Sequence, residues 1–197
     1  MGDGVITISE IERCPWSEVD ELYIEYHDRE WGVPVHDDKK WFEFLILEGA
    51  QAGLNWHTVL KKRESYREAF AGFVPRVVAD FGSGEVEELF KNAGIIRNRR
   101  KIESAINNAK RFLEIEAEFG AFDTYIWGFV GNRPIVNKWE SLSEIPPLTE
   151  KSAEISRSLK QRGFTFVGPT IVYALMQATG LVNDHLVHCF RYTEVWD

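Results

Sequence analysis

The chain contains only two cysteines, and a histidine follows or precedes each at a spacing suited to metal ligands. Cys14 and His27 lie near the amino end, and His185 and Cys189 lie near the carboxyl end. His185 and Cys189 are four positions apart, and residues at this spacing share one face of a helix. Two cysteines and two histidines form a set that binds zinc tetrahedrally and leaves no position for water or substrate. A metal bound in this way would be structural and would join the two ends of the chain.

The spacing alone leaves other interpretations open. The two cysteines could form a disulfide, or each could be an ordinary buried thiol. His188 also competes with His185, although it is adjacent to Cys189 and neighbouring side chains diverge on a helix. The first twelve residues lack the basic segment and apolar run of a signal peptide, so we expect a cytoplasmic protein. Reduced thiols in that compartment favour a metal over a disulfide.

Composition describes a globular protein and restricts the partners it can have. A hydrophobic content of 44% and a charged content of 27% over 197 residues are typical of one domain or two closely joined subdomains. The longest clean apolar run, 44–47, is too short to cross a membrane. A net charge of -8 disfavours nucleic acid as a partner without excluding it. Basic residues do cluster, at 61–63, within 97–101, and at 160 and 162, although such clusters are usually solvated helix ends.

Apolar periodicity predicts an all-α fold, and no alternating strand pattern competes with it. The residues from 38 to 52 are apolar nearly all round and indicate a buried helix. Further helices are predicted over 57–71, 84–92, 98–119, 150–162 and 169–179, with a connecting loop over 131–149 and a last helical turn over 185–189.

The segment RGFTFVGPTIVYALMQATGLVNDHLVHC, residues 162–189, is the most informative continuous stretch. It predicts a helix, a tight turn at Val167, Gly168 and Pro169, and a second helix that opens at Thr170. A glycine-bearing turn at a helix start lets backbone N–H groups approach a phosphate. Helix-hairpin-helix elements hold DNA in this way without reading bases. A plain helical hairpin fits the same residues.

This hairpin resembles that of the helix-hairpin-helix DNA glycosylases, in which a G-V-G turn and its helix precede a V-D-T-H run. Residues 182–185 read Val-Asn-Asp-His here. Asn183 therefore stands where that superfamily has its catalytic aspartate. Asp184 is one place away, and we do not assign it the nucleophile-activating role.

One branch of that superfamily is much more similar, the bacterial-type 3-methyladenine DNA glycosylase I family, from residue 14 to about residue 192. The matching blocks are RCPW (13–16), LYIEYHDREWGVP (22–34), LEGAQAGLNWHTVLKKRESYR (47–67), AGIIRNRRKI (93–102) and SLSEIP (141–146), besides the hairpin. The resemblance implies an all-α glycosylase domain over 1–197, formed as one unit or as two subdomains around a cleft, with the helix-hairpin-helix at about 156–180. It also implies a structural zinc ion bound by Cys14, His27, His185 and Cys189, which favours His185 over His188.

The resemblance further implies a pocket for a flipped, alkylated base. A cationic planar base is bound by aromatic faces and a carboxylate. Glu48 would hydrogen-bond the adenine edge and is the expected catalytic residue, and Trp56 would stack on the base. The remaining implied wall residues are Trp16, Tyr23, Tyr26 and Trp31, and the implied DNA-binding residues are Val167, Gly168 and Thr170. Without the resemblance, a glutamate near a helix end is usually solvated, and these aromatic residues are ordinary core.

The implied activity is hydrolytic release of free 3-methyladenine from alkylated double-stranded DNA by a monomer. Alkylation weakens the glycosidic bond, so binding and electrostatic stabilisation, with water as nucleophile, suffice for the reaction. The match places no lysine that could form a Schiff base, so we expect no strand cleavage. The main alternative is a non-catalytic, zinc-stabilised helix-hairpin-helix DNA-binding module. A zinc hydrolase, which needs an open metal position, and a metal-free interaction protein are the others.

Overall fold

The computed structural model describes residues 11–195 and is mostly helical, as the apolar periodicity predicts. The prediction made on the first twelve residues lies almost wholly outside this range. The elements are α1 (Glu21–Arg29), α2 (Asp38–Gln51), α3 (Trp56–Leu60), α4 (Arg63–Ala69), α5 (Pro75–Ala79), α6 (Ser83–Lys91), α7 (Arg99–Phe119), α8 (Phe122–Gly128), β1 (Ile135–Val136), α9 (Glu150–Gln161), α10 (Pro169–Ala178), β2 (Val182–Asn183) and α11 (Arg191–Glu194). Short 3-10 turns lie at Pro15–Ser17, Ala71–Phe73 and Leu142–Glu144.

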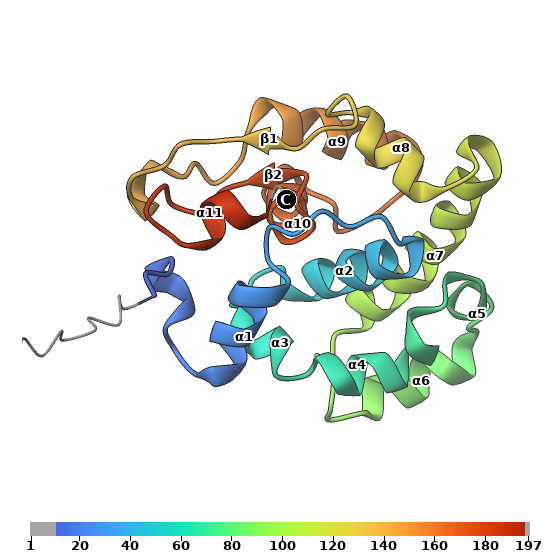
Figure 1. Cartoon of the computed structure of the whole chain (residues 1–197). Helices are drawn as coiled ribbons and strands as arrows, with labels where there is room; N and C mark the ends of the chain where they lie inside the picture. The colour runs from blue at the N-terminus through green and yellow to red at the C-terminus, as the bar shows by residue number, and fades with distance from the viewer. Residues whose placement is uncertain (1–10, 196–197) are drawn as a thin grey trace, which may run out of the picture.

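Helix α2 lies at the centre of the molecule, and α3, α7, α8 and α10 pack around it (Figure 1). Every residue from Trp41 to Glu48 is buried, which confirms the fully buried helix predicted from the sequence. Asp37 accepts a hydrogen bond from the backbone of Lys40 and fixes the start of the helix. The residues at the end of α2 therefore have a rigid support.

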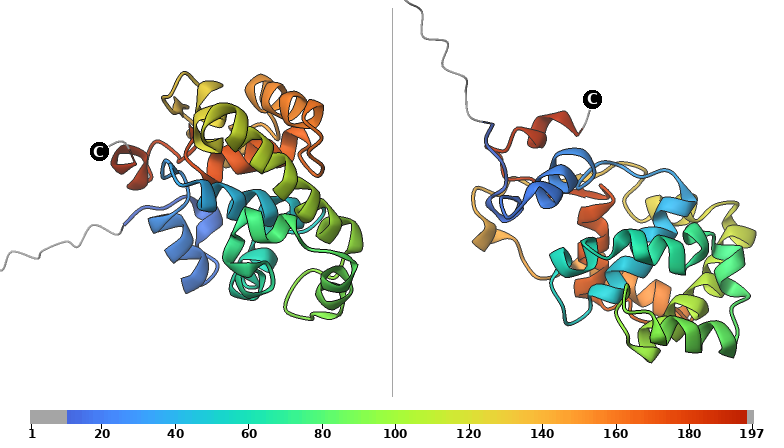
Figure 2. Two further views of the ribbon diagram at one scale, coloured as in Figure 1. Left: turned by 90° about the vertical axis from the view of Figure 1, so that its right-hand side faces the viewer. Right: turned by 90° about the horizontal axis from the view of Figure 1, so that it is seen from below.

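Helix α7 is the longest element and covers one side of α2 (Figures 1 and 2). Asn98 caps its first turn, and its apolar stripe faces the core. Phe112 on this stripe stacks on Phe122 of α8, with ring centroids 4.3 Å apart. The helix ends at Gly120, whose φ of +86° is the left-handed conformation that favours glycine.

The structure corrects three of the predicted elements. The helix predicted over 57–71 breaks at Lys62, because Arg63 turns inward to pair with Glu30 and Glu43, both at 2.7 Å. Residues 185–189 form turns instead of the predicted helical turn. A parallel pair of two-residue strands joins Ile135 to Val182, which is too short to leave an alternating pattern in the sequence.

The segment just before α11 lies close to the amino-terminal end of the described chain. Figures 1 and 2 show α11 on the same side of the molecule as this end. The backbone of Phe190, just before α11, donates to the carbonyl of Glu12. The loop after α1 crosses the end of α10, where Gly32 donates to Gln177 and Val35 donates to Thr179. None of the helices within residues 11–195 is long and apolar enough to cross a membrane.

Gly180 lies where this loop crosses the end of α10, and a substitution there tests how closely the two segments pack. Its φ is +70°, and an added Cβ would lie 2.4 Å from the backbone nitrogen of Pro34. We predict that Gly180→Ala lowers the free energy of unfolding by about 3 kcal/mol or more, through backbone strain and overlap. Thermal unfolding measures the change, and Gly84→Ala, where a Cβ meets nothing within 4 Å, is the control. Equal melting temperatures for the two variants would show that the crossing tolerates a side chain.

Candidate functional site

The four predicted metal ligands meet in one buried cluster. Cys14 precedes the first 3-10 turn, His27 lies on α1, and His185 and Cys189 lie in the turns after β2. Their ligand atoms all lie within 4.8 Å of one another. Cys189 Sγ lies 3.5 Å from His27 Nε2 and 3.6 Å from His185 Nδ1. The chain thus brings together residues 162 and more positions apart in the sequence.

Neighbouring groups orient both histidines toward the sulfurs. His27 Nδ1 lies 2.7 Å from an Asp28 oxygen, which leaves Nε2 facing the cluster. His185 Nε2 lies 3.1 Å from the carbonyl of Trp31, which leaves Nδ1 facing the cluster. Metal-binding histidines in proteins are held in this manner by a carboxylate or carbonyl on the far nitrogen. The donor set and its support therefore fit a tetrahedral zinc ion.

The structure bears on two of the alternatives, the disulfide and the rival histidine. Cys14 and Cys189 are not joined by a disulfide. Hydrogen bonds from Cys14 and then His185 lower the pKa of the Cys189 thiol, which favours its thiolate. The backbone N–H of Leu186 donates to Cys14 Sγ at 3.4 Å. His188 lies outside the cluster, 3.6 Å from a carboxylate oxygen of Glu12.

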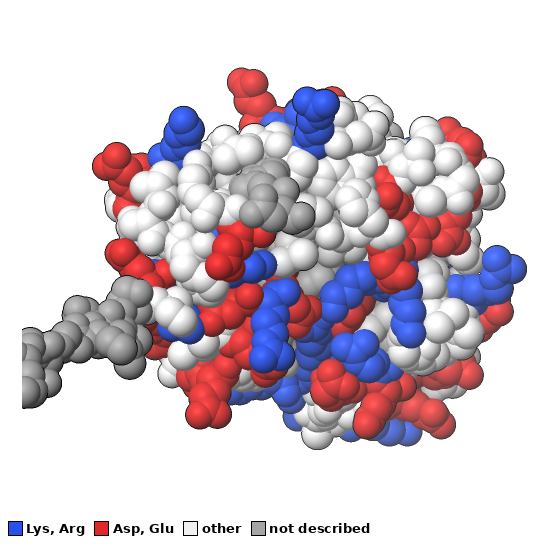
Figure 3. All heavy atoms as spheres, in the orientation of Figure 1, with Lys and Arg blue, Asp and Glu red and all other residues white. Residues whose placement is uncertain are grey.

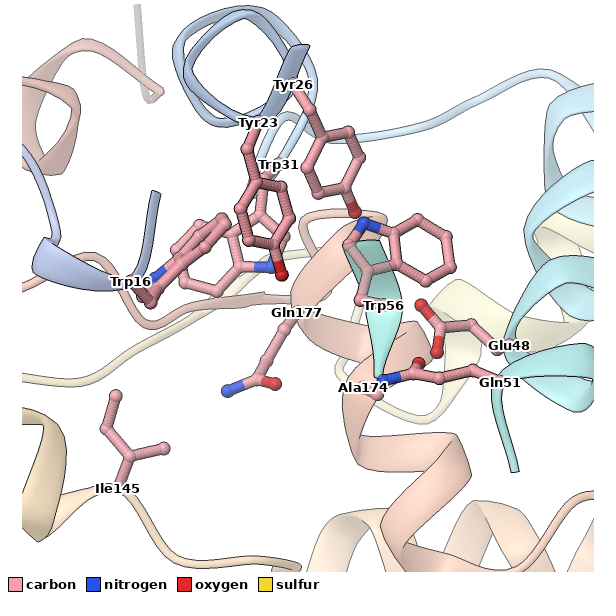
Figure 4. A pocket seen from close by; sticks show the side chains of 10 residues that line it. All are labelled: Trp16, Tyr23, Tyr26, Trp31, Glu48, Gln51, Trp56, Ile145, Ala174 and Gln177. Atoms are coloured by element: carbon pink, nitrogen blue, oxygen red, sulfur yellow. The ribbon is translucent and has the colours of Figure 1, made fainter. Parts of the chain in front are cut away.

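All six predicted base-binding side chains line a single cavity of about 210 Å³ (Figure 4). They are Trp16, Tyr23, Tyr26, Trp31, Glu48 and Trp56. Gln51, Ile145, Ala174 and Gln177 complete the lining and were not predicted. Gln51 follows Glu48 by one helical turn, and that spacing could have revealed it. Nothing in the sequence pattern of α10 or of the 131–149 loop indicated the other three.

The cluster of two cysteines and two histidines directly supports one wall of the pocket. Trp31 lies edge-on to the His185 ring at 4.6 Å and to Trp16 at 4.9 Å. Trp16 also lies edge-on to His27 at 5.3 Å and to Tyr23 at 5.2 Å. These edge-to-face contacts fix the rings in place. Two ligand histidines thus hold the two tryptophans of this wall.

The opposite wall is built on the end of α2 and the start of α3. The Trp56 ring stacks on Phe44 at 6.5 Å and lies tilted against Tyr26 at 5.4 Å. Its indole Nε1 is buried without a hydrogen-bond partner among residues 11–195. Burial raises the pKa of Tyr26 well above its ordinary value, so its hydroxyl stays a donor in the pocket.

Glu48 is the most informative side chain of the pocket. It is 3% exposed, which contradicts the interpretation of a solvated glutamate. Its Oε2 has no hydrogen-bond partner within the described chain, and burial raises its pKa to about 8. By contrast, Glu43 on the same helix is paired with Arg63 and Arg67. An unpaired buried carboxyl group in a pocket is costly and suits a cationic ligand that donates hydrogen bonds.

The residues at the place of the superfamily aspartate have structural contacts. Asn183 is 1% exposed, accepts from the backbone of His185 and donates to the carbonyl of Tyr192. It therefore stabilises the segment that carries two metal ligands. Asp184 is also 1% exposed, and each of its oxygens accepts two hydrogen bonds. This occupation leaves Asp184 unsuited to activate a nucleophile.

The predicted hairpin lies between α9 and α10, and α10 begins at Pro169, as the helix predicted over 169–179 does. The side chain of Val167 is buried, whereas Gly168 caps α10 and Thr170 is exposed. The amide of Asn108 on α7 donates to and accepts from the backbone of Thr165, both at 2.9 Å. This pairing fixes the loop that leads into α10.

A second cavity of about 180 Å³ connects the hairpin to the base pocket. Glu48, Gln51 and Ala174 line both cavities, and Thr170 and Ile171 line only the second. The start of α10, where backbone N–H groups lack helical partners, thus lies next to the pocket. Thr170, one of the three predicted DNA-binding positions, is therefore close to the base-binding side chains.

The predicted basic clusters are only partly available to a ligand. Lys101 donates to the carbonyls of Ala50 and Ala52, and Arg99 and Arg162 pair with glutamates at 2.6 Å. Arg97 and Arg100 are exposed and form no ion pair with residues 11–195. Figure 3 shows basic and acidic side chains interleaved on the face over α1, α3 and α4.

Comparisons with known proteins agree with this geometry. The family model for methyladenine glycosylase matches residues 16–192. DNA-3-methyladenine glycosylase 1 of Escherichia coli (strain K12) is 53% identical over 182 residues, which cover 92% of this chain and 97% of that protein. A crystal structure of a 3-methyladenine DNA glycosylase I superposes with a TM-score of 0.89 at 50% identity, covering 91% of this chain and 98% of that one.

A structure described as the basis of 3-methyladenine recognition, from the Staphylococcus aureus glycosylase, superposes with a TM-score of 0.88 at 36% identity. It covers 91% of this chain and 96% of that one. The helical fold is that of a DNA glycosylase. The chain belongs to the methyladenine glycosylase family, and the family and enzyme class predicted from the sequence are confirmed.

The raised pKa of Glu48 makes stability depend on pH. The carboxyl group has an ordinary pKa of 4.5 and a folded value of about 8, so the folded chain holds a proton that the unfolded chain releases between these values. Stability therefore falls as pH rises from about 4.5 to 8. We predict that Glu48→Gln removes this loss, so that the variant gains stability over the native chain by up to about 4 kcal/mol at pH 8. Urea unfolding at pH 5 and pH 8 measures it.

Glu103→Gln is the control for this comparison, because Glu103 is exposed on α7. It should leave the pH dependence unchanged. A stability difference between Glu48→Gln and the native chain that is the same at both pH values would mean that Glu48 is ionised in the folded protein.

Proposed function

We propose that this chain hydrolyses the glycosidic bond of 3-methyladenine in alkylated double-stranded DNA and releases the free base. The observation that carries the proposal is Glu48, an unpaired buried carboxyl group in a small pocket lined with aromatic rings. N3 alkylation gives adenine a positive charge. Ring faces attract such a cation, and the carboxyl group accepts its hydrogen bonds.

The pocket acts mainly by binding the flipped base. A cation that enters beside Glu48 favours the ionised carboxylate, because opposite charges at close range stabilise each other. Trp56 stacks on the base, and Trp16 and Trp31 form the facing wall. The bond to the alkylated base is already weak, so the developing sugar cation needs electrostatic stabilisation and a water nucleophile. Unmodified adenine has neither the charge nor the weak bond and is left in place.

The hairpin holds the DNA backbone beside this pocket. The N–H groups at the start of α10, from Thr170 onward, face a phosphate, and Gly168 permits its close approach. Arg97 and Arg100 supply exposed charge for the backbone. Main-chain contacts of this kind carry no sequence information, which suits an enzyme that searches for damage in any sequence.

The enzyme works without strand cleavage. None of the described residues that line the pocket is a lysine, so no amine stands ready to attack the sugar. Asp184 and Asn183 are fully engaged in structural hydrogen bonds. A protein–DNA adduct trapped by borohydride would contradict this part of the proposal.

Cys14, His27, His185 and Cys189 hold a structural zinc ion. Four buried protein ligands fill a tetrahedral site, so the ion has no position for substrate or activated water. The ion would cross-link the amino-terminal segment to the carboxyl-terminal turns. A zinc hydrolase is disfavoured by the same four ligands.

The activity is tested by base release. Methylated duplex DNA is incubated with the protein, and the freed purines are separated by chromatography. We predict release of 3-methyladenine, with adenine and 7-methylguanine retained. Glu48→Gln should lower the release rate by about 100-fold, the order expected for a charge-assisted hydrogen bond that serves the transition state, and Glu103→Gln should leave it unchanged. DNA binding without any base release would favour the non-catalytic binding module.

The zinc proposal is tested by metal content and stability. We predict one zinc ion per chain by elemental analysis. Cys189→Ser should lose the metal and lower the melting temperature by 10 °C or more, because zinc no longer stabilises the folded state. Each kcal/mol of lost stability lowers the melting temperature of a chain of this size by about 3 °C. His188→Ala should retain both the metal and the melting temperature. Native protein that is purified without metal and gains no stability on adding zinc would contradict the assignment.

A further inference from the structure

Asp184 is the centre of a buried hydrogen-bond network behind the pocket. One oxygen accepts from Asn137 and Trp139, at 2.7 and 2.8 Å. The other accepts from the hydroxyl of Tyr173 and from Gln177 Nε2, the latter at 2.8 Å. An indole N–H can only donate, so the carboxylate must accept from Trp139. The network thus presents a fixed acceptor to every neighbouring side chain.

This acceptor determines which way the Gln177 amide faces. The amide nitrogen donates to Asp184, so the amide oxygen is the end that remains free for a ligand. The backbone carbonyl of Gln177 is also held, since Gly32 donates to it at 3.0 Å. Figure 4 shows the side chain entering the pocket from α10, with its oxygen toward the side where Glu48 lies. Gln177 is therefore a preset hydrogen-bond acceptor in the pocket wall.

An alkylated adenine has one group that can satisfy such an acceptor. In the nucleotide, N9 carries the sugar, N3 carries the methyl group, and N1 and N7 carry no hydrogen. The exocyclic amino group is thus the only N–H donor of the base. We propose that Gln177 accepts a hydrogen bond from this amino group, and that Asp184 is the positioning residue that fixes the amide. Gln177 then determines specificity for an amino purine against one with a carbonyl oxygen at the same position, where two acceptors would face each other.

The inference rests on the proposed base-binding function, and calorimetric titration with free bases tests both. The probes are 3-methyladenine and 3-methylhypoxanthine, which has a carbonyl oxygen in place of the amino group. We expect the native chain to prefer 3-methyladenine, and Gln177→Met, which keeps the length of the side chain, to reduce this preference about 10-fold. Tyr173→Phe removes a different donor to Asp184 and should retain the preference. Asp184→Asn should reduce it, because the amide of Gln177 can then turn.

The outcomes separate a specificity role from a structural one. An equal loss of affinity for both bases in Gln177→Met would mean that the side chain only shapes the cavity, and would overturn the assignment. An unchanged preference would overturn it as well. If Asp184→Asn does not fold, the Gln177→Met ratio decides alone. A native chain that binds 3-methyladenine no better than the second base, yet releases it from DNA, removes the inference and keeps the proposed function; failure of both measurements removes both.

Discussion

The convergence of Cys14, His27, His185 and Cys189 is the constraint on which the rest of the site depends. The cluster joins the segment before α1 to the turns after β2. Two of the pocket tryptophans are close to these ligands in the sequence, with Trp16 two residues after Cys14 and Trp31 four residues after His27. Their rings pack against the ligand histidines themselves. The residues that join the two ends of the chain therefore also support one wall of the pocket.

The other wall is held in place by helix α2, and it contains a buried carboxyl group that lowers the stability of the fold. Helix α2 is buried along most of its length, which holds Glu48 where no side chain of the described chain compensates its charge. Five residues earlier, Glu43 is compensated by Arg63 and Arg67. One helix thus contains a paired and an unpaired carboxyl group. The unpaired one lowers stability at neutral pH, and a cationic base can recover that loss on binding.

Much of this could be predicted from the sequence, and the exceptions have physical reasons. The buried α2 follows from apolar periodicity, and residue type singled out the cysteines and histidines as candidate ligands. The resemblance chose His185 over His188 and assigned six pocket residues that the structure brings together. The break at Lys62 was missed, because it depends on tertiary ion pairs of Arg63 with Glu30 and Glu43. Residues 185–189 were wrongly predicted as helical, since ligand spacing does not require a helix. Gln177 was missed, because its orientation depends on a hydrogen bond from its amide to Asp184, which the residue pattern does not indicate.

If Cys14, His27, His185 and Cys189 hold zinc and support the base pocket, the affinity for 3-methyladenine should fall when zinc is removed. Calorimetry would follow 3-methyladenine binding before and after chelation, with circular dichroism reporting the helices in the same samples. We predict that affinity falls by at least 10-fold while most of the helical signal remains, because Trp16 and Trp31 lose their support before the α2 and α7 core is affected. Unchanged affinity in fully metal-free, folded protein would contradict it.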